Sequence, residues 1–339
     1  MKLALFALTF ALAAPSFAKP AARVLVKSRS PIVALAYAPN GQILASADDA
    51  HRVTLTDVSS GQTKQVFGYK EKVVALAFAP DGKLLAVGVG KQIRLLDPKS
   101  DLKTAAPKRV LEMKMPVNST LQFSADGRVL LAVEVDYSTG EGYAVDVWSV
   151  ASGKLIRRHQ TKYTESYAAA LAPDGKTFVA PTGVVGAGLF SVATGQKLRD
   201  LSGDFPHNTG FYVGDFAFSP DGKHIAGTGG FMESSGNFTV WDARSGKVKW
   251  SHIIDDYGIA LAWAPDGARV ATGTSYDTTY DDPKDLHQPT GTPVWSASGK
   301  WQRSLQRVPG KINALAWAPN GKTLATGGKD GVVRLWAVK

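Results

Sequence analysis

Short apolar segments alternate with turn sequences along most of the chain. Typical segments are residues 33–37 and 74–78, and each is followed at once by a turn. Small side chains alternate with large ones within them, as in residues 314–317, which read Ala-Leu-Ala-Trp. A period of two is the pattern of a β-strand, and small residues suit strands that approach one another closely near an axis. The pattern therefore predicts an all-β chain.

One four-residue turn recurs seven times. Its copies are Ala38-Pro39-Asn40-Gly41, Ala79-Pro80-Asp81-Gly82, Ser124-Ala125-Asp126-Gly127, Ala172-Pro173-Asp174-Gly175, Ser219-Pro220-Asp221-Gly222, Ala264-Pro265-Asp266-Gly267 and Ala318-Pro319-Asn320-Gly321. Their glycines are 41 to 54 residues apart. Proline presets φ and glycine accepts a positive φ, which is the chemistry of a hairpin turn. A repeat of this length indicates a solenoid, a propeller or an array.

Each copy except the last contains four predicted strands. The apolar strand before the turn is followed by a second strand, such as residues 43–47. A third strand ends in a pair such as Thr56-Asp57, and a second turn, Ser60-Gly61 in the first copy, leads to a fourth strand. Four strands to a full copy predict four-stranded antiparallel sheets, one for each of the seven copies.

The repeat resembles the WD-repeat family of β-propellers over nearly all of residues 19–339. A Trp-Asp pair occurs at Trp241-Asp242, whereas the family's Gly-His pair is replaced by Gly68-Tyr69. TolB-like propellers share the Pro-Asp-Gly turn and are a weaker resemblance, because the late tryptophans of the third strands favour the WD repeat. The resemblance implies one domain, a seven-bladed propeller that is stabilised by apolar packing between its blades.

The resemblance also implies how the ring closes. The last copy supplies only three strands before Lys339, and a strand at residues 22–27 belongs to no copy. We expect this N-terminal strand to complete the last blade. Closure of this kind removes sheet edges that could otherwise aggregate.

Residues 1–18 have the pattern of a secretory signal peptide. Lys2 precedes an apolar run at residues 3–14, and Ser16-Phe17-Ala18 places small residues where cleavage after Ala18 needs them. A run this short is below the ~20 residues that span a bilayer, which disfavours an uncleaved anchor. The pattern predicts a periplasmic or secreted protein.

Composition narrows the range of functions. Apolar residues make up 44% of the chain and charged residues 20%, which excludes wholesale disorder. The absence of cysteine excludes disulfides, iron–sulfur clusters and cysteine nucleophiles. The formal net charge is +10, but the lysines sit on regular turns rather than in a groove with stacking aromatics. We therefore expect no nucleic-acid partner, and only weak electrostatic association with an anionic envelope surface.

The two faces of such a propeller differ in their loops. The face with the turns between strands one and two, and three and four, is expected to be short-looped and basic. Its cations are Lys83, Arg128, Lys154, Lys176, Lys223, Lys247, Lys300 and Lys322. The opposite face is predicted to carry the long insertions, including residues 102–117 and 200–213. Variable loops on a uniform scaffold usually carry binding.

Exposed aromatic residues beside carboxylates fit the centre of a protein interface. The predicted partner-binding residues on the long-loop face are Tyr137, Phe211, Tyr212, Phe231, Tyr276, Tyr280, Asp281, Asp282 and Asp285. The alternative for each aromatic is packing against its own loop.

No catalytic motif stands out. The chain has no nucleophile elbow, no dinucleotide fingerprint and no Walker A loop. The acidic loop at 281–287 contains Lys284 and lacks the spacing of a calcium loop, so a solvated loop is the better interpretation. The six histidines are scattered over different copies. We predict no catalytic residue, no metal site and no cofactor.

These observations favour a non-catalytic, exported propeller, monomeric by itself. It would act as a scaffold for a protein or peptide partner through its long-loop face. The alternative is an enzyme, or a small-ligand or metal-binding propeller, whose residues converge at the central axis; the fold alone does not decide between the two.

Overall fold

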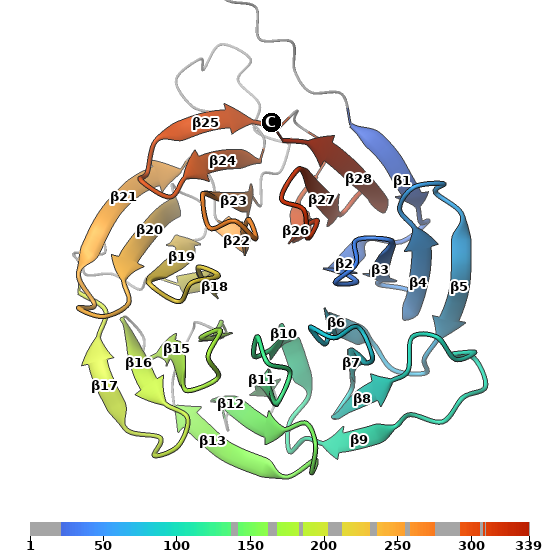
Figure 1. Cartoon of the computed structure of the whole chain (residues 1–339), viewed down its shortest axis with the longest axis horizontal. Coiled ribbons are helices and arrows are strands. Elements are labelled where there is room, and N and C mark those ends of the chain that lie inside the picture. The colour runs from blue at the N-terminus through green and yellow to red at the C-terminus, as the bar shows by residue number, and fades with distance from the viewer. Residues whose placement is uncertain are drawn as a thin grey trace, which may run out of the picture.

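Seven four-stranded antiparallel sheets surround a central axis in the computed structural model, which confirms the predicted propeller (Figure 1). The structure describes residues 22–136, 142–161, 168–182, 186–202, 212–230, 236–254, 258–274, 292–305, 308 and 310–338. The predicted signal peptide, residues 1–18, lies outside them. No helix in these ranges is long and apolar enough to cross a membrane.

Chain order is blade order, and the first strand of each blade is the innermost (Figure 1). Blade 1 contains β2 (Ile32–Tyr37), β3 (Ile43–Asp48), β4 (Arg52–Asp57) and β5 (Thr63–Gly68). Blade 2 contains β6 (Val73–Phe78), β7 (Leu85–Val89), β8 (Gln92–Leu96) and β9 (Arg109–Glu112). Blade 3 contains β10 (Val117–Phe123), β11 (Val129–Asp136), β12 (Gly142–Ser149) and β13 (Leu155–Thr161). Blade 4 contains β14 (Ala170–Leu171), β15 (Thr177–Pro181), β16 (Ala187–Ser191) and β17 (Lys197–Asp200).

The remaining blades follow the same plan. Blade 5 contains β18 (Tyr212–Phe218), β19 (His224–Gly230), β20 (Gly236–Asp242) and β21 (Val248–Ile254). Blade 6 contains β22 (Gly258–Trp263), β23 (Arg269–Thr274), β24 (Pro293–Ser296) and β25 (Trp301–Ser304). Blade 7 contains β26 (Ile312–Trp317), β27 (Thr323–Gly328), β28 (Val332–Ala337) and β1 (Arg23–Lys27).

Blade 7 is closed by the N-terminal strand, as the resemblance implied. Strand β1 pairs antiparallel with β28, so that Arg23 faces Leu335 and Lys27 faces Val332. The register shifts between Val24 and Val26. The ring is thus joined by strand pairing between the two ends of the described chain.

The core lies between the blades. On β11, Leu130 and Ala132 pack with residues of blade 2, whereas Leu131 and Val133 pack with residues of blade 4. Alternate side chains of one strand therefore reach opposite neighbours, as the period of two predicts. All four of these side chains are fully buried.

The repeated turn also joins neighbouring blades. Gly82 has a φ of +70°, and the space where its Cβ would stand is 3.6 Å from Cδ of Pro39 in the preceding turn. The same proline-on-glycine contact joins four other pairs of turns. Blade 3 has Ala125 in place of proline, and its free N–H donates to the Pro173 carbonyl at 2.8 Å. Proline therefore presets its own turn and also packs against the next one.

One sequence-based assignment is wrong. Residues 102–117 were predicted as a connection between blades on the long-loop face, but they contain β9 (Arg109–Glu112). The 97–108 segment instead joins the third and fourth strands of blade 2, on the short-turn face. It contains no glycine, and without the glycine turn of the other copies the short fourth strand went unrecognised. Blade 2 thus carries a long insertion on the face that was expected to be uniform.

Candidate functional site

The predicted partner-binding residues are not brought together by the described part of the structure. Eight of them lie outside the described residues: Tyr137, Phe211, Phe231, Tyr276, Tyr280, Asp281, Asp282 and Asp285. The backbone of Tyr212 begins β18, but its side chain also lies outside the described part. Contact through these residues stays a prediction.

The short-turn face is less positive than its lysines suggest. Lys83 lies 3.4 Å from Asp81 of its own turn, and Lys223 lies 3.5 Å from Asp221. These pairs are exposed and contribute little to stability, but each neutralises a cation locally. The turn's own hydrogen bonds keep these carboxylates charged: the Lys83 backbone N–H is the main cause that lowers the pKa of Asp81.

Near the axis, polar side chains of three inner strands hold the backbone of the next blade. Gln122 of blade 3 forms two hydrogen bonds with Leu171 of blade 4, at 3.1 and 2.9 Å. Asn313 of blade 7 donates to the Ile32 carbonyl of blade 1 at 2.9 Å, which ties the ring at its closure. These bonds satisfy backbone groups on the open edges of the inner strands.

Asp215 is the charged member of this set. Its Oδ2 accepts the Leu261 N–H of blade 6 at 2.9 Å, and its Oδ1 accepts the Phe216 N–H at 2.8 Å. Burial raises the pKa of Asp215 to about 7, although both hydrogen bonds favour the carboxylate. The side chain therefore titrates near neutral pH while it joins blades 5 and 6.

At the rim, outer strands reach across to the third-to-fourth-strand turn of the next blade. Arg109 donates to the Ser152 and Ala151 carbonyls, both at 2.8 Å, and Arg23 of β1 donates to the Val58 and Ser59 carbonyls, both at 2.8 Å. Gln65 and Arg157 make equivalent contacts with blades 2 and 4. Trp250 makes a similar contact, donating from Nε1 to the Ala297 carbonyl of blade 6 at 3.0 Å. Our sequence analysis missed these clamps, yet Gln65, Arg157 and Trp250 all lie four residues after a turn glycine.

A charged cluster is buried between blades 2 and 3. The guanidinium of Arg158 lies 2.7 Å from Glu134 and 2.9 Å from Asp146, and both carboxylates are almost wholly buried. Oε2 of Glu134 also accepts the Met115 N–H at 3.1 Å. Burial, and then the neighbouring Glu134, raise the pKa of Asp146 against the opposing effect of Arg158. Two carboxylates share one cation here, so a proton on Asp146 relieves the excess charge.

Within the ranges that the structure covers, no three His, Asp or Glu residues are grouped so that they could hold a metal ion. The polar groups described near the axis serve the contacts between blades. Their arrangement holds the ring together.

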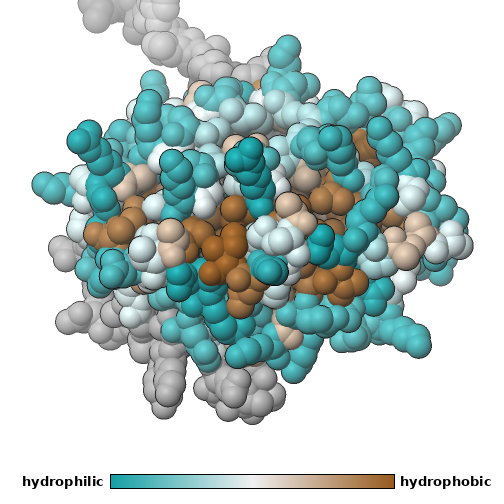
Figure 2. All heavy atoms as spheres, turned by 60° about the horizontal axis from the view of Figure 1, so that its bottom comes forward, coloured by the Kyte–Doolittle hydropathy of each residue, from teal (hydrophilic) through white to brown (hydrophobic). Residues whose placement is uncertain are grey.

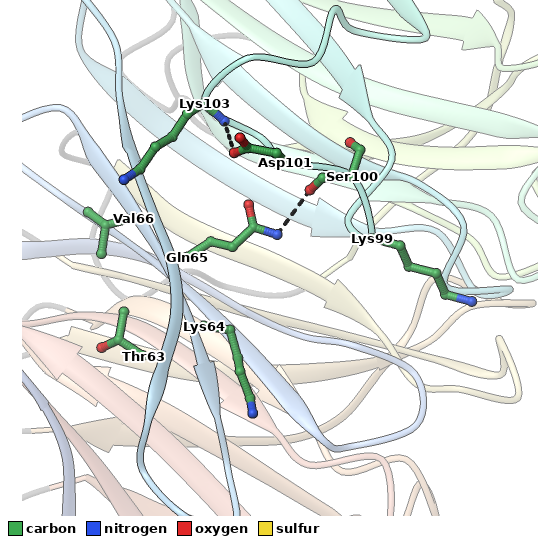
Figure 3. A pocket seen from close by; sticks show the side chains of 8 residues that line it. All are labelled: Thr63, Lys64, Gln65, Val66, Lys99, Ser100, Asp101 and Lys103. Carbon is green, nitrogen blue, oxygen red and sulfur yellow. Dashed lines mark hydrogen bonds between the residues drawn. The ribbon is translucent and has the colours of Figure 1, made fainter.

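Two neighbouring cavities lie on the short-turn face. One, of about 740 Å³, lies between blades 7 and 1 and is lined by Tyr37, Asp57 and Arg23 among others. The second, of about 690 Å³, lies between blades 1 and 2. The second continues toward the rim into a cavity of about 620 Å³ beside the insertion of blade 2 (Figure 3).

The rim itself is apolar. The exposed large apolar side chains of the described residues all lie on the outermost strands: Val24, Val66, Val110, Leu155, Ile156, Leu198, Val248, Ile253 and Trp301. Figure 2 shows apolar side chains gathered in a band with polar side chains above and below it. Every blade thus contributes at least one of its outermost residues to an apolar rim.

Comparison with known proteins agrees with this architecture. Residues 61–97, 196–242 and 294–337 match the family model described as "WD domain, G-beta repeat". Each match begins before the outer strand of one blade or within its third strand, and runs into the next blade. The sequence repeat is therefore offset from the structural blade.

Curated relatives match part of the chain. It is 28% identical over 138 residues to an uncharacterized WD repeat-containing protein of Deinococcus radiodurans, covering 37% of this chain and 49% of that protein. It is 28% identical over 139 residues to MST50-interacting protein 11 of Pyricularia oryzae, covering 41% of each. It is 30% identical over 152 residues to small ribosomal subunit protein RACK1 of Glycine max, covering 43% of this chain and 44% of that protein. The chain spans less than half the length of each of these relatives.

Proposed function

Because this chain is a seven-bladed propeller that carries WD40 repeats, we propose that it is a scaffold for a protein or peptide partner. The observation that carries the proposal is the closed ring, in which Gln122, Asp215 and Asn313 near the axis, and clamps such as Arg109 at the rim, join one blade to the next. A ring held in this way is a rigid support for loops, and binding residues are commonly placed on loops that a rigid scaffold positions.

The relatives are consistent with this role. One is named as an interacting protein and another as a protein of the small ribosomal subunit, and both names describe association with other molecules. We propose the same general role for this chain, with a partner of its own. Contact would run through the long-loop face, with the predicted aromatic residues as anchors and the predicted aspartates as a charged rim.

We also propose that the protein is exported, on the strength of the signal pattern at residues 1–18. The test is the N-terminal sequence of the protein recovered from the periplasm or the medium after expression with its own leader. We expect the mature chain to begin at Lys19. An intact residue 1–18 segment on protein that stays with the cells would refute export.

The interaction itself is tested by crosslinking the mature protein in its native envelope and identifying the partner by mass spectrometry. A variant with alanine at Phe231, Tyr276 and Tyr280 should lose that partner. Trp301→Ala is the matched control, because Trp301 is an exposed aromatic residue (48%) on the rim strand β25. A partner retained by the triple variant, or lost equally from the control, would refute contact through the long-loop face.

A further inference from the structure

A groove lies between blades 1 and 2 on the short-turn face, the face opposite the long loops. We propose that it binds an extended, acidic peptide segment that inserts an apolar side chain. The groove consists of the cavities of about 690 Å³ and 620 Å³, which share Lys64, Gln65 and Lys99 in their walls. It therefore runs from the turn face to the outer strand β5, a shape suited to an extended chain.

The inner part of the groove is apolar. Pro39, Ile43, Leu55, Phe78 and Pro98 line it. Leu55 is 3% exposed, so it forms a floor, and Phe78 packs against the same core cluster. A pocket with apolar walls favours an aliphatic or aromatic side chain, because burial removes apolar surface from water on both partners.

The groove also carries an excess of positive charge. Its walls contain Lys64, Lys83, Lys99 and Lys103, and the carboxylates among the described lining residues are Asp81 and Asp101. Lys64 lies 3.8 Å from Asp57 and Lys83 lies 3.4 Å from Asp81, so the excess charge is that of Lys99 and Lys103. The hydrogen bonds of its own loop occupy Asp101, which accepts from the Lys103 N–H and the Thr104 hydroxyl. Lys99 and Lys103 form no ion pair with any residue that the structure describes.

The neighbouring cavity shows that this charge is not general to the blade interfaces. Between blades 7 and 1, the charged lining residues are one cation, Arg23, and one carboxylate, Asp57, which lies 3.8 Å from Lys64 of the groove. The Arg23 guanidinium is also occupied by the carbonyls of Val58 and Ser59. The groove beside the blade 2 insertion, unlike this neighbouring cavity, combines an apolar floor with two cations that form no ion pair among the described residues. A partner with carboxylates beside its apolar residue is therefore complementary to it.

The groove wall is held in place before a partner arrives. Gln65 donates to the Ser100 carbonyl at 3.0 Å (Figure 3). It also accepts the Leu102 N–H at 2.9 Å, and the side chain of Leu102 is buried in the core. These bonds fix the insertion against β5. A preformed wall lowers the ordering cost of binding, which leaves more of the interaction energy as affinity.

The test uses a fluorescein-labelled peptide in which Leu-Phe is flanked by Glu-Glu on both sides. One control peptide has lysine for each glutamate, and another has Ser-Ser for Leu-Phe. Fluorescence anisotropy should show that the protein binds the acidic apolar peptide at least about tenfold more tightly than either control, a tenfold change being about 1.4 kcal/mol. Equal binding of the three peptides, or no binding, would overturn the proposal.

The K99E/K103E double variant tests whether the peptide binds in this groove. It should weaken binding by about tenfold or more, and added salt should weaken the wild type in the same direction because these cations are exposed. The matched control is K154E/K300E, which reverses two turn lysines of the same face at other blades. Unchanged binding in K99E/K103E, or an equal loss in the control, would overturn the assignment to this groove.

Three further measurements distinguish this groove from the other possible sites and ligands. On the wild type, hydrogen exchange should slow at residues 63–67 and 97–103 when the acidic peptide is added, which does not depend on how a variant folds. Binding to phosphatidylglycerol vesicles that K99E/K103E abolishes, without peptide binding, would replace the peptide by a membrane surface. The alanine variant of Phe231, Tyr276 and Tyr280 should bind the peptide normally, so failure of the long-loop proposal leaves this one standing.

Discussion

Replacement of Asp215 by asparagine should change how the stability of the ring depends on pH. In the wild type, burial raises the pKa of Asp215 to about 7, whereas the ordinary value is 3.8. Between pH 3.8 and about pH 7, the native state therefore holds a proton on Asp215 that the unfolded chain has already released. The stability that this proton contributes is fully present below pH 3.8 and is lost as the pH rises from 3.8 to about 7.

The magnitude follows from those two pKa values. Between about pH 5 and pH 8 the wild type should lose about 2.5 kcal/mol of unfolding free energy through Asp215, an upper value because the residue keeps some contact with solvent. Asp215→Asn removes the titration. Its amide oxygen can accept the Leu261 N–H, but the contact with the Phe216 N–H is lost, at a constant cost of about 1 kcal/mol at every pH.

Urea denaturation of both proteins at about pH 5 and pH 8 tests this, with the difference between them as the readout. The difference cancels the contribution of His159 and His224, whose pKa values are lowered and which stabilise the fold as the pH rises. We expect the unfolding free energy of the variant, relative to that of the wild type, to rise by about 2.5 kcal/mol from pH 5 to pH 8. A difference that does not change with pH would refute the view that Asp215 is neutral when it joins blades 5 and 6.

Three further perturbations test the ring. Deletion of residues 22–27 should abolish soluble folding, because it removes β1 and the Arg23 clamp together; a truncated protein with an unchanged melting curve would contradict this. Arg158→Met should destabilise the fold by about 3–5 kcal/mol in urea, because it leaves the buried Glu134 and Asp146 without their cation, and a loss below about 1 kcal/mol would show that the cluster is not paired as described. Ala125→Pro should cost about 1 kcal/mol, because it removes the N–H that bonds Pro173, even though proline stands here in the other six turns; a stabilised variant would show that proline packing outweighs that bond.

Much of the fold could be predicted because each blade repeats the same local chemistry. The turn from Ala79 to Gly82 and its six relatives mark every blade. The resemblance to the WD-repeat family implied that the strand at residues 22–27, which belonged to no copy, closes the ring. The first strands of blades 3 and 4 were harder to predict. Strand β10 reads Val-Asn-Ser-Thr-Leu-Gln-Phe, and β14 has only two residues, so the apolar alternation is weak in both.

The functional features were less predictable, since they depend on contacts between blades. The rim clamps use Gln65 in one blade and Arg157 in another, because a backbone carbonyl accepts from any donor, and no single residue type marks the position. Glu134 and Asp146 lie on adjacent strands, and their meeting with Arg158 depends on register. The blade 1–2 groove arises from the 97–108 insertion, whose face was misassigned when β9 was not recognised.

The pairing of β1 with β28 has a consequence for chain connectivity. Arg23 lies opposite Leu335, so the described chain enters the ring beside the point where it leaves it. A short hairpin from Ala337 to Arg23 would complete a third-to-fourth-strand turn like those of the other blades. The protein should therefore accept circular permutation: joining these ends and opening the chain at Ser152-Gly153 would move the noncovalent seam from blade 7 to blade 3 without altering any strand.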